Sequence, residues 1–502
     1  MKKNLKLLAL MAACVVVLVG AMIVVLNLPE NEEVVETSSS DAILIFDKSS
    51  LIAEDITVSN ESGEYNLLGF DYSEAVSGDE ASESSGESTI IYTMQEYENQ
   101  TLSKTMTDSL AEQCVYMAAL KVVDKSGERD SEYGLDNPRA TVSVVYSDNS
   151  EVKMYIGNDA PDNKGVYFKM DGKKTVYLVQ ENMINMFLVD KLQMFVKELS
   201  SSFDTDETIQ TVKLSGSFYD TDVYIKPIDN NANYCNFVMD TPYRAICDND
   251  FFEGFGESFY GMRSSTVIAV DVTEDDIKEY GLDNPYIEAE ITASDDTGVH
   301  ILASEADSNN NCYIMASGAS IIYQMSIDDL IWYEVTYRDF LSNSIVVPNM
   351  QNLIDVDISV DGQEYHYDIT HTKTINETYD EIISNEVIYN GEKITYSNMS
   401  TFINNVTGIT RGYTSPESIE DCTKIFSIKY TFDGDDALTD ILELYKTSDN
   451  QTVAVLNGNI EGYTDSEYAE NVIQQVSEIA QSEKLESLNS QDNLESSEGS
   501  EE

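Results

Sequence analysis

The heptapeptide Glu-Tyr-Gly-Leu-Asp-Asn-Pro occurs twice in this chain, at Glu132–Pro138 and at Glu279–Pro285. The sequence around each copy matches the other at a nearly constant offset: Val122–Asp124 precedes the first copy as Ala269–Asp271 precedes the second. Similarity that recurs at a fixed spacing is typical of tandem structural modules. A duplicated enzyme would be expected to carry a duplicated set of reactive residues, and the two copies show none. The pattern therefore indicates a repeated scaffold.

The repeated peptide is typical of a helix end. In the second copy Thr273 and Asp276 have the spacing of a capping box, and Gly281 can take the left-handed conformation that ends a helix. A proline follows and prevents any continuation of the helix. We interpret Asp283, like Asp136 in the first copy, as a turn residue whose side chain bonds the local backbone. The alternative is a ligand for a cation or a partner.

The candidate site residues are therefore structural, and no catalytic, cofactor-binding or metal-binding residue is assigned. Both copies contribute the same six residue types. These are Tyr133, Gly134, Leu135, Asp136, Asn137 and Pro138 in the first copy, and Tyr280, Gly281, Leu282, Asp283, Asn284 and Pro285 in the second.

Strand patterns surround both copies. Ala140–Tyr146 and Glu151–Ile156 alternate apolar and polar residues on either side of a short turn, which predicts a hairpin. A second hairpin follows over Val166–Val179, and a helical pattern precedes each copy, over Ser109–Leu120 and Asp250–Met262. Each module thus combines an antiparallel β-meander with short helices. We predict an α+β fold made of two clear modules and one degenerate module in tandem.

The third module is inferred from its start. Val356–Ser359 resembles the strands that open the other modules, Ile56–Ser59 and Val212–Ser215, but no third heptapeptide follows. A terminal repeat is commonly atypical because it closes the array. The expected order is a cytoplasmic basic start (1–6), a transmembrane helix (7–28), an acidic spacer (29–50), module 1 (51–204) with a disordered insertion (73–88), module 2 (205–345), a degenerate capping module 3 (346–480) and a disordered acidic tail (481–502).

The N-terminus predicts a membrane anchor. Lysines among the first six residues precede an apolar run from Leu7 to Leu28, which is long enough to span a bilayer as a helix. Basic residues before a span keep the start of a chain in the cytoplasm. We therefore expect a single-pass plasma-membrane protein with the residues after Pro29 extracytoplasmic. A cleaved signal peptide and lipidation at Cys14 are the alternatives.

The charge of the chain restricts its partners. The formal net charge is -62, with 91 acidic against 29 basic residues. A polyanion of this kind excludes nucleic acid as a natural ligand, and it excludes anionic lipid unless divalent cations bridge the two surfaces. Solubility in an exposed compartment accounts for the charge. Weak association with divalent cations is the sharper alternative, although no EF-hand spacing is present.

Residues with reactive side chains are sparse. The six cysteines lack CxxC spacing, and the three histidines are isolated in the sequence, so neither a zinc site nor a catalytic site is predicted. Cys235 and Cys247 are the one short-range candidate pair for a disulfide, while burial as small apolar residues is the preferred interpretation for the cysteines outside the anchor. We expect no cofactor and no enzymatic activity.

Tyrosine is the remaining signal, with 31 Tyr against 16 Phe and one Trp. Tyrosines at alternating strand positions, such as Tyr365 and Tyr367, could stack on sugars or anchor a protein interface. The simpler interpretation is that they are half-buried sheet residues, as their β propensity favours.

The first module resembles a bacterial domain-of-unknown-function family over four runs: Tyr133–Val142, Tyr155–Pro161, Val166–Met170 and Val176–Val179. With the second module the resemblance extends over about 51–344, although Leu302–Ala306 replaces the Ile-Gly-x-x-Ala-Pro element there. Members of this family are membrane-anchored extracytoplasmic proteins encoded beside gliding-motility-type ABC transport systems. The resemblance supplies no catalytic residues.

These observations lead to one expected function and one alternative. The expected function is a non-enzymatic extracytoplasmic accessory or scaffold component of an ABC-type transport complex. Its partners would be a membrane-embedded permease or other envelope protein, with the membrane contacted through the N-terminal helix. The alternative is a cell-envelope ligand-binding protein that recognises glycan or peptide through tyrosine-rich sheet faces.

Overall fold

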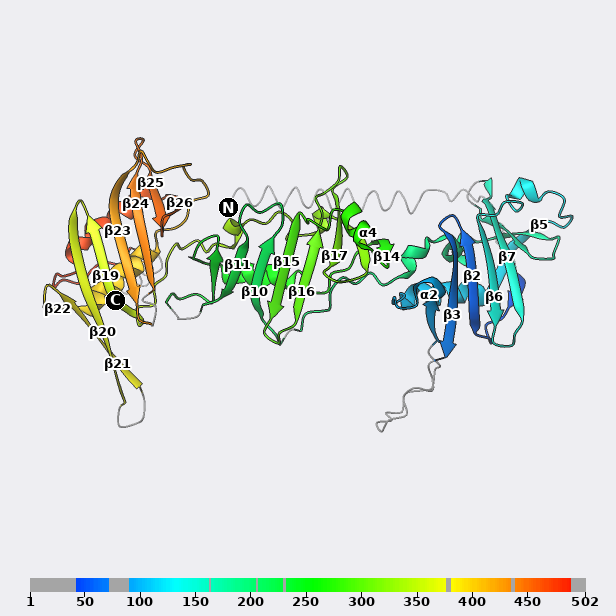
Figure 1. Cartoon of the computed structure of the whole chain (residues 1–502), viewed down its shortest axis with the longest axis horizontal. Coiled ribbons are helices and arrows are strands. Elements are labelled where there is room, and N and C mark those ends of the chain that lie inside the picture. The colour runs from blue at the N-terminus through cyan, green and yellow to red at the C-terminus, as the bar shows by residue number, and fades with distance from the viewer. Residues whose placement is uncertain are drawn as a thin grey trace, which may run out of the picture. The chain divides into compact units, whose positions relative to one another are not determined.

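The protein is mostly β. The computed structural model describes residues 42–71, 90–161, 164–204, 206–228, 232–375, 381–434 and 438–488. Strands make up 43% of the structure and form three antiparallel sheets (Figure 1). The predicted α+β class is therefore wrong. After Val179 the apolar residues Ile184, Phe187 and Leu188 have the spacing of a helix face, but this segment forms short 3-10 turns instead, η4 (Glu181–Met183) and η5 (Asn185–Leu188).

The first sheet has nine strands, of which the first, β1, lies in the segment expected to be a spacer. Their order is β1 (Ile43–Asp47), β5 (Tyr116–Asp124), β9 (Val176–Val179), β8 (Val166–Met170), β7 (Glu151–Asp159), β6 (Ala140–Tyr146), β2 (Ala53–Asn60), β3 (Gly63–Asp71) and β4 (Ile90–Met94).

The second sheet also has nine strands. Their order is β13 (Ala245–Ile246), β12 (Phe237–Thr241), β11 (Val223–Pro227), β10 (Ile209–Ser215), β15 (Ile287–Ala293), β16 (Gly298–Ala303), β17 (Asn311–Ala316), β18 (Ile321–Ser326) and β14 (Thr266–Val270).

The third sheet has eight strands. Their order is β22 (Glu392–Ile394), β21 (Glu381–Tyr389), β20 (Gln363–Ile375), β19 (Leu353–Val360), β23 (Thr423–Phe432), β24 (Thr439–Lys446), β25 (Thr452–Leu456) and β26 (Asn459–Thr464).

The three sheets share one strand order. In each, the first strand of the repeat (β2, β10 or β19) has a hairpin partner on one side and, on the other, a strand that comes after the helix (β6, β15 or β23). Beyond β6, β15 or β23, three more strands extend each sheet and end at β9, β18 or β26. Beyond these strands the first two sheets add β5 or β14, and within the described residues the third sheet has no such strand. The missing strand is the one that leads into the heptapeptide, so strand and heptapeptide are absent together.

Helices are few and short. In each repeat one helix lies in the chain between the opening strands and β6, β15 or β23. These helices are α2 (Lys104–Val115), α3 (Asn249–Glu257) and α5 (Tyr396–Thr407), and α2 begins five residues before the expected stretch. The others are α4 (Glu274–Glu279) and α6 (Ser466–Gln474), with 3-10 turns η1 (Gln95–Tyr97), η2 (Asp130–Tyr133), η6 (Lys191–Met194), η7 (Ile327–Asp329), η8 (Tyr337–Phe340) and η9 (Gln475–Glu478).

The cores follow the strand alternation. Every second residue of β6 and of β15 is buried, as the period of a half-buried strand requires. In the third repeat α5 buries Met399, Phe402 and Val406 against the sheet. Residues 481–488, expected to belong to a disordered tail, also pack there: Asn398 Nδ2 donates to the Glu483 carbonyl at 2.9 Å, and Leu485 is buried.

The expected membrane localisation is corrected. In the part of the chain that the structure describes, no helix combines the length and apolar character needed to cross a bilayer. The predicted span, 7–28, lies outside the described residues, as does the predicted insertion, 73–88. A single-pass plasma-membrane protein is therefore not supported.

The chain divides into two compact units. Among the described residues, one unit contains those up to Asp71 together with Asp108–Val189, and the other contains the rest. The second and third sheets thus belong to one unit, and contacts between them are part of its structure.

Candidate functional site

The second heptapeptide ends helix α4, which begins with a capping box. The Asp276 N–H donates to Thr273 Oγ1 at 3.3 Å, and the Thr273 N–H donates to Asp276 Oδ2 at 2.8 Å. The hydrogen bonds from Thr273 lower the pKa of Asp276. The carboxylate is therefore already committed to the helix start.

Both copies stop the preceding turn in the same way. Gly134 and Gly281 have φ angles of 70° and 72°, a left-handed conformation that glycine adopts at no steric cost. The next N–H reaches back five residues: Leu135 donates to the Asp130 carbonyl at 2.9 Å, and Leu282 donates to the Ile277 carbonyl at 2.8 Å. This is the pattern of a Schellman helix stop.

The heptapeptides also build a small apolar cluster against their sheets. Tyr133 and Leu135 pack with Val176, and Leu282 packs with Met315 and Ile322. In each copy the tyrosine faces a second tyrosine at a ring separation of 4.7 Å, Tyr167 in the first copy and Tyr313 in the second. The burial of these side chains explains why the peptide is repeated.

Gly157 is the residue on which the first heptapeptide rests. A Cβ at this position would lie 2.2 Å from the Tyr133 carbonyl oxygen, so no side chain fits. The equivalent residue in the second sheet is Ser304, whose hydroxyl accepts a hydrogen bond from the Tyr313 N–H at 2.9 Å. The second sheet therefore accommodates a side chain at this position, whereas the first does not.

The polar end of each heptapeptide is exposed. Asp136 and Asn137 in the first copy, and Asp283 and Asn284 in the second, lie on the surface. Neither aspartate belongs to a described group of side chains that could hold a metal ion. The structure thus brings the apolar half of the motif into a core and leaves the acidic half in solvent.

Two groups of acidic and histidine side chains were missed in the sequence. Glu288, Glu290 and His300 form one group, and Asp355, His366 and Asp368 form the other; within each group the ligand atoms lie within 4.8 Å of one another. Such donors suit a divalent cation. The members come from paired strands, so only knowledge of the register could have grouped them.

A groove lies beside the first heptapeptide. Its volume is about 470 Å³, and it lies where β2 ends and β6 begins. The side chains around it are polar, with charges of both signs, above one leucine. They are Ser59, Asn60, Glu61, Asn137, Pro138, Arg139, Thr141 and Leu188.

A larger groove, of about 630 Å³, lies on the third repeat. None of its lining side chains is charged, although 24% of the residues in the chain are. Tyr234 is 63% exposed, and burial, together with the neighbouring Tyr234 side chain, raises the pKa of Tyr396. The other lining residues are Val347, Pro348, Met350, Gln351, Asn385, Ser400, Thr401, Ile403, Asn404 and Thr407.

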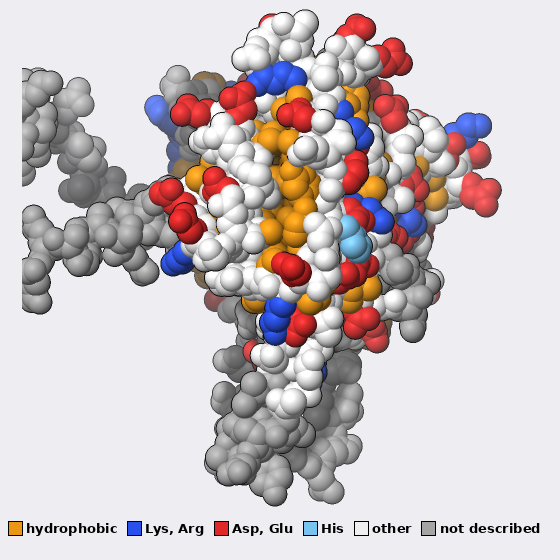
Figure 2. Space-filling view, turned by 90° about the vertical axis from the view of Figure 1, so that its left-hand side faces the viewer, with side chains coloured by type: hydrophobic (Ala, Val, Ile, Leu, Met, Phe, Trp, Pro, Cys, Tyr) orange, Lys and Arg blue, Asp and Glu red, His pale blue; other side chains and the backbone are white. Residues whose placement is uncertain are grey.

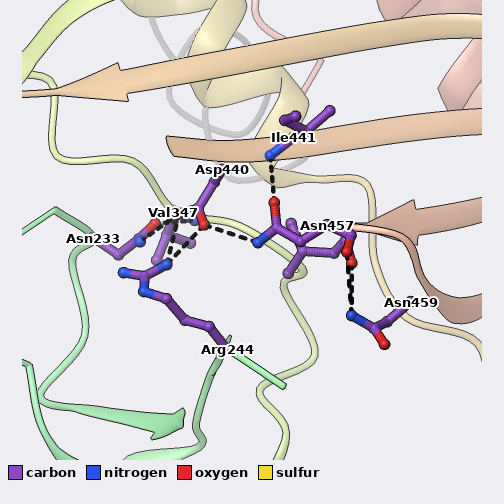
Figure 3. Close-up of polar contacts among 8 residues, drawn as sticks. Asn233, Arg244, Val347, Asp440, Ile441, Asn457 and Asn459 are labelled. Carbon is purple, nitrogen blue, oxygen red and sulfur yellow. Dashed lines mark hydrogen bonds and ion pairs between the residues drawn. The ribbon is translucent and has the colours of Figure 1, made fainter. Parts of the chain in front are cut away.

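One wall of this groove is fixed by a buried ionic network (Figure 3). Arg244 Nη1 donates to both carboxylate oxygens of Asp440, at 2.7 and 3.0 Å, and Asn233 Nδ2 donates to the same carboxylate at 3.1 Å. Asn233 also accepts the Val347 N–H at 3.3 Å, and Val347 in turn accepts the Tyr234 N–H at 2.8 Å. The backbone of the exposed Tyr234 is thus linked through Val347 and Asn233 to the buried carboxylate of Asp440.

Figure 2 shows one face of the molecule, on which hydrophobic side chains gather in a central stripe with acidic side chains spread around it. Surface of neutral character therefore persists within a strongly acidic protein. A ligand without negative charge can reach such a surface without strong repulsion.

The five cysteines in the described residues are free thiols. Cys235 and Cys247, the candidate disulfide pair, are not bonded, and burial raises their pKa to about 11 and about 12. Cys114, Cys247 and Cys312 are buried as expected, whereas Cys235 and Cys422 are only half-buried.

The comparison with protein families finds a domain in the same region. Residues 93–223 match the family described as a domain of unknown function (DUF4340), and no curated protein matches the chain. The match runs from β4 to the start of β11 and contains the first heptapeptide. The chain thus contains a domain of a family without a described function, consistent with the resemblance noted from its sequence.

Proposed function

We propose that this chain is a non-enzymatic scaffold that acts as an accessory component of an ABC-type transport complex. The observation that supports this most is the nature of what is repeated. One strand order occurs three times, and the residues repeated with it form a helix stop and an apolar cluster. What the repeats share is thus a framework, and repeated frameworks commonly present extended surfaces to protein partners.

The test is crosslinking of the tagged full-length protein in its native cells, followed by affinity capture and mass spectrometry. The matched control is an unrelated tagged protein of similar length and negative charge, because a polyanion captures cationic proteins without specificity. Recovery of permease and ATPase subunits above this control supports the proposal. Recovery of the same proteins with both baits contradicts it.

The second candidate function is the binding of a neutral glycan or peptide. The uncharged groove around Tyr234 and Tyr396 favours it, because its volume lies in the range of small-ligand sites and its amides and hydroxyls suit neutral polar groups. Tyr234→Ala should weaken binding of neutral oligosaccharides about tenfold in calorimetry, as expected for loss of an aromatic anchor. Tyr413→Ala is the control, since Tyr413 is fully exposed and outside the groove. An equal effect of both substitutions, or none, argues against this function.

A further inference from the structure

The first and second sheets have an equivalent surface beside the proline of the heptapeptide, which we call the seat. Ser59 pairs with Thr141 in the first sheet as Ser215 pairs with Glu288 in the second. The residues just after the heptapeptide proline also correspond: the Arg139 N–H donates to the Ile156 carbonyl at 2.8 Å, and the Tyr286 N–H donates to the Ala303 carbonyl at 2.9 Å. The two seats can therefore be compared residue by residue.

In the second sheet the chain itself occupies this seat. After β10 the backbone turns onto the heptapeptide, where the Ser217 N–H donates to the Pro285 carbonyl and the Phe218 N–H donates to the Tyr286 carbonyl, both at 3.0 Å. The Phe218 ring lies 5.4 Å from the Tyr286 ring. The occupant is thus a short stretch of polypeptide held by two backbone donors and an aromatic side chain.

Gly216 makes this approach possible. Its φ angle is +114°, and a Cβ there would lie 2.5 Å from the Tyr286 carbonyl oxygen. A glycine at this point allows the two backbones to meet. The contact is therefore specified by the sequence.

In the first sheet the corresponding hairpin does not reach the seat. β2 and β3 remain paired up to Asn60 and Gly63, so the chain turns back at once, whereas β10 and β11 pair only up to Leu214 and Val223. The groove of about 470 Å³ lies beside the residues that correspond to Pro285 and Tyr286, whose carbonyls the segment 216–219 contacts in the second sheet. Pro138 and Arg139 line it, with Leu188 as its apolar part.

We propose that the groove of the first sheet binds an extended peptide segment of a partner protein. Two successive N–H groups of the segment donate to the carbonyls of Pro138 and Arg139, and the following side chain packs on Leu188. The segment adopts the place that 216–219 holds in the second sheet. This inference rests on the proposed scaffold function and specifies the kind of partner and its point of attachment.

The experiment titrates the full-length protein, labelled at leucine methyl groups, with the synthetic peptide Leu-Ser-Gly-Ser-Phe-Tyr-Asp, which is the sequence of residues 214–220. We expect saturable shifts of the Leu188 methyl signals. A control peptide that is N-methylated at the positions of Ser217 and Phe218 lacks both donors. It should bind at least about tenfold more weakly.

The protein variant Thr141→Trp, which fills the groove, should weaken binding to a similar degree while the other leucine methyl signals stay in place. Equal binding of the two peptides, absence of Leu188 shifts, or unaltered binding by this variant would overturn the inference. The control peptide decides the matter even if the variant does not fold. Capture of permease subunits together with failure of the peptide would reject this groove alone and leave the scaffold proposal standing.

Discussion

At the scale of single residues, paired strands bring histidine and carboxylate side chains together. His366 Nδ1 lies 2.7 Å from Asp357 Oδ1, and Asp355, Asp368 and Lys429 complete the surroundings on the paired strands. The hydrogen bond to Asp357 raises the pKa of His366 above its ordinary value of 6.5. Three of the four neighbours are carboxylates, so the protonated ring is favoured.

This geometry predicts a pH dependence. The folded-state pKa of His366 lies above the unfolded value, so its protonated ring contributes stability below about pH 6.5, and that contribution is lost as the pH rises through the folded pKa. Nuclear magnetic resonance titration of the ring should give a pKa above 6.5. Asp357→Asn should lower it, and an unchanged value in that variant would contradict the assignment of its cause.

Gly157 gives a second prediction at this scale. Gly157→Ala should destabilise the protein by about 1–3 kcal/mol in urea unfolding, because the new Cβ overlaps the Tyr133 carbonyl oxygen. Gly254→Ala is the matched control. Nothing lies within 4 Å of a Cβ there, and alanine favours the helix by about 0.5–1 kcal/mol. A stable Gly157→Ala protein would show that the heptapeptide does not rest on this strand.

At the scale of elements, the sequence predicted what is local. Thr273, Asp276 and Gly281 lie within nine residues of one another, so the start and the end of helix α4 could be recognised from spacing alone. The hairpin of β6 and β7 was predicted for the same reason, since alternation and a turn suffice.

The wrong predictions concern tertiary context. Ile184, Phe187 and Leu188 have helical spacing, but their segment forms consecutive 3-10 turns. Asn60 Nδ2 holds the end of this segment by donating to the carbonyls of Phe187 and Val189. Apolar periodicity cannot foresee such a contact over more than a hundred residues. The acidic and histidine groups were missed because they depend on the register of paired strands. The two grooves were missed because their lining residues come from segments that lie far apart in the sequence.

At the scale of the whole molecule, ionic contacts join the segment after the second sheet to the third. Arg411 Nε donates to Glu461 Oε2 at 2.6 Å, and the two side chains are 8% and 0% exposed. Arg411 Nη1 also donates to the carbonyls of Ser342 and Ser344. The segment that leaves the second sheet is thus tied to β26.

Arg411→Met should therefore destabilise the protein by about 3–5 kcal/mol, because it leaves a buried carboxylate without its partner. Lys393→Met removes an exposed ion pair with Glu386 and should cost less than about 1 kcal/mol. Urea unfolding of both variants provides the comparison. Similar losses from the two substitutions would show that the Arg411 pair is not needed for stability.

The shared strand order also has a consequence for biosynthesis. The centre of each sheet joins a strand from the start of the repeat to one that emerges from the ribosome much later, as β2 joins β6. Until β6 has been made, the edge of the β2–β3 hairpin has no partner, and such edges pair readily with other chains. Each repeat thus passes through an aggregation-prone stage during translation, and its sheet closes only when the strand after the helix, β6, β15 or β23, arrives.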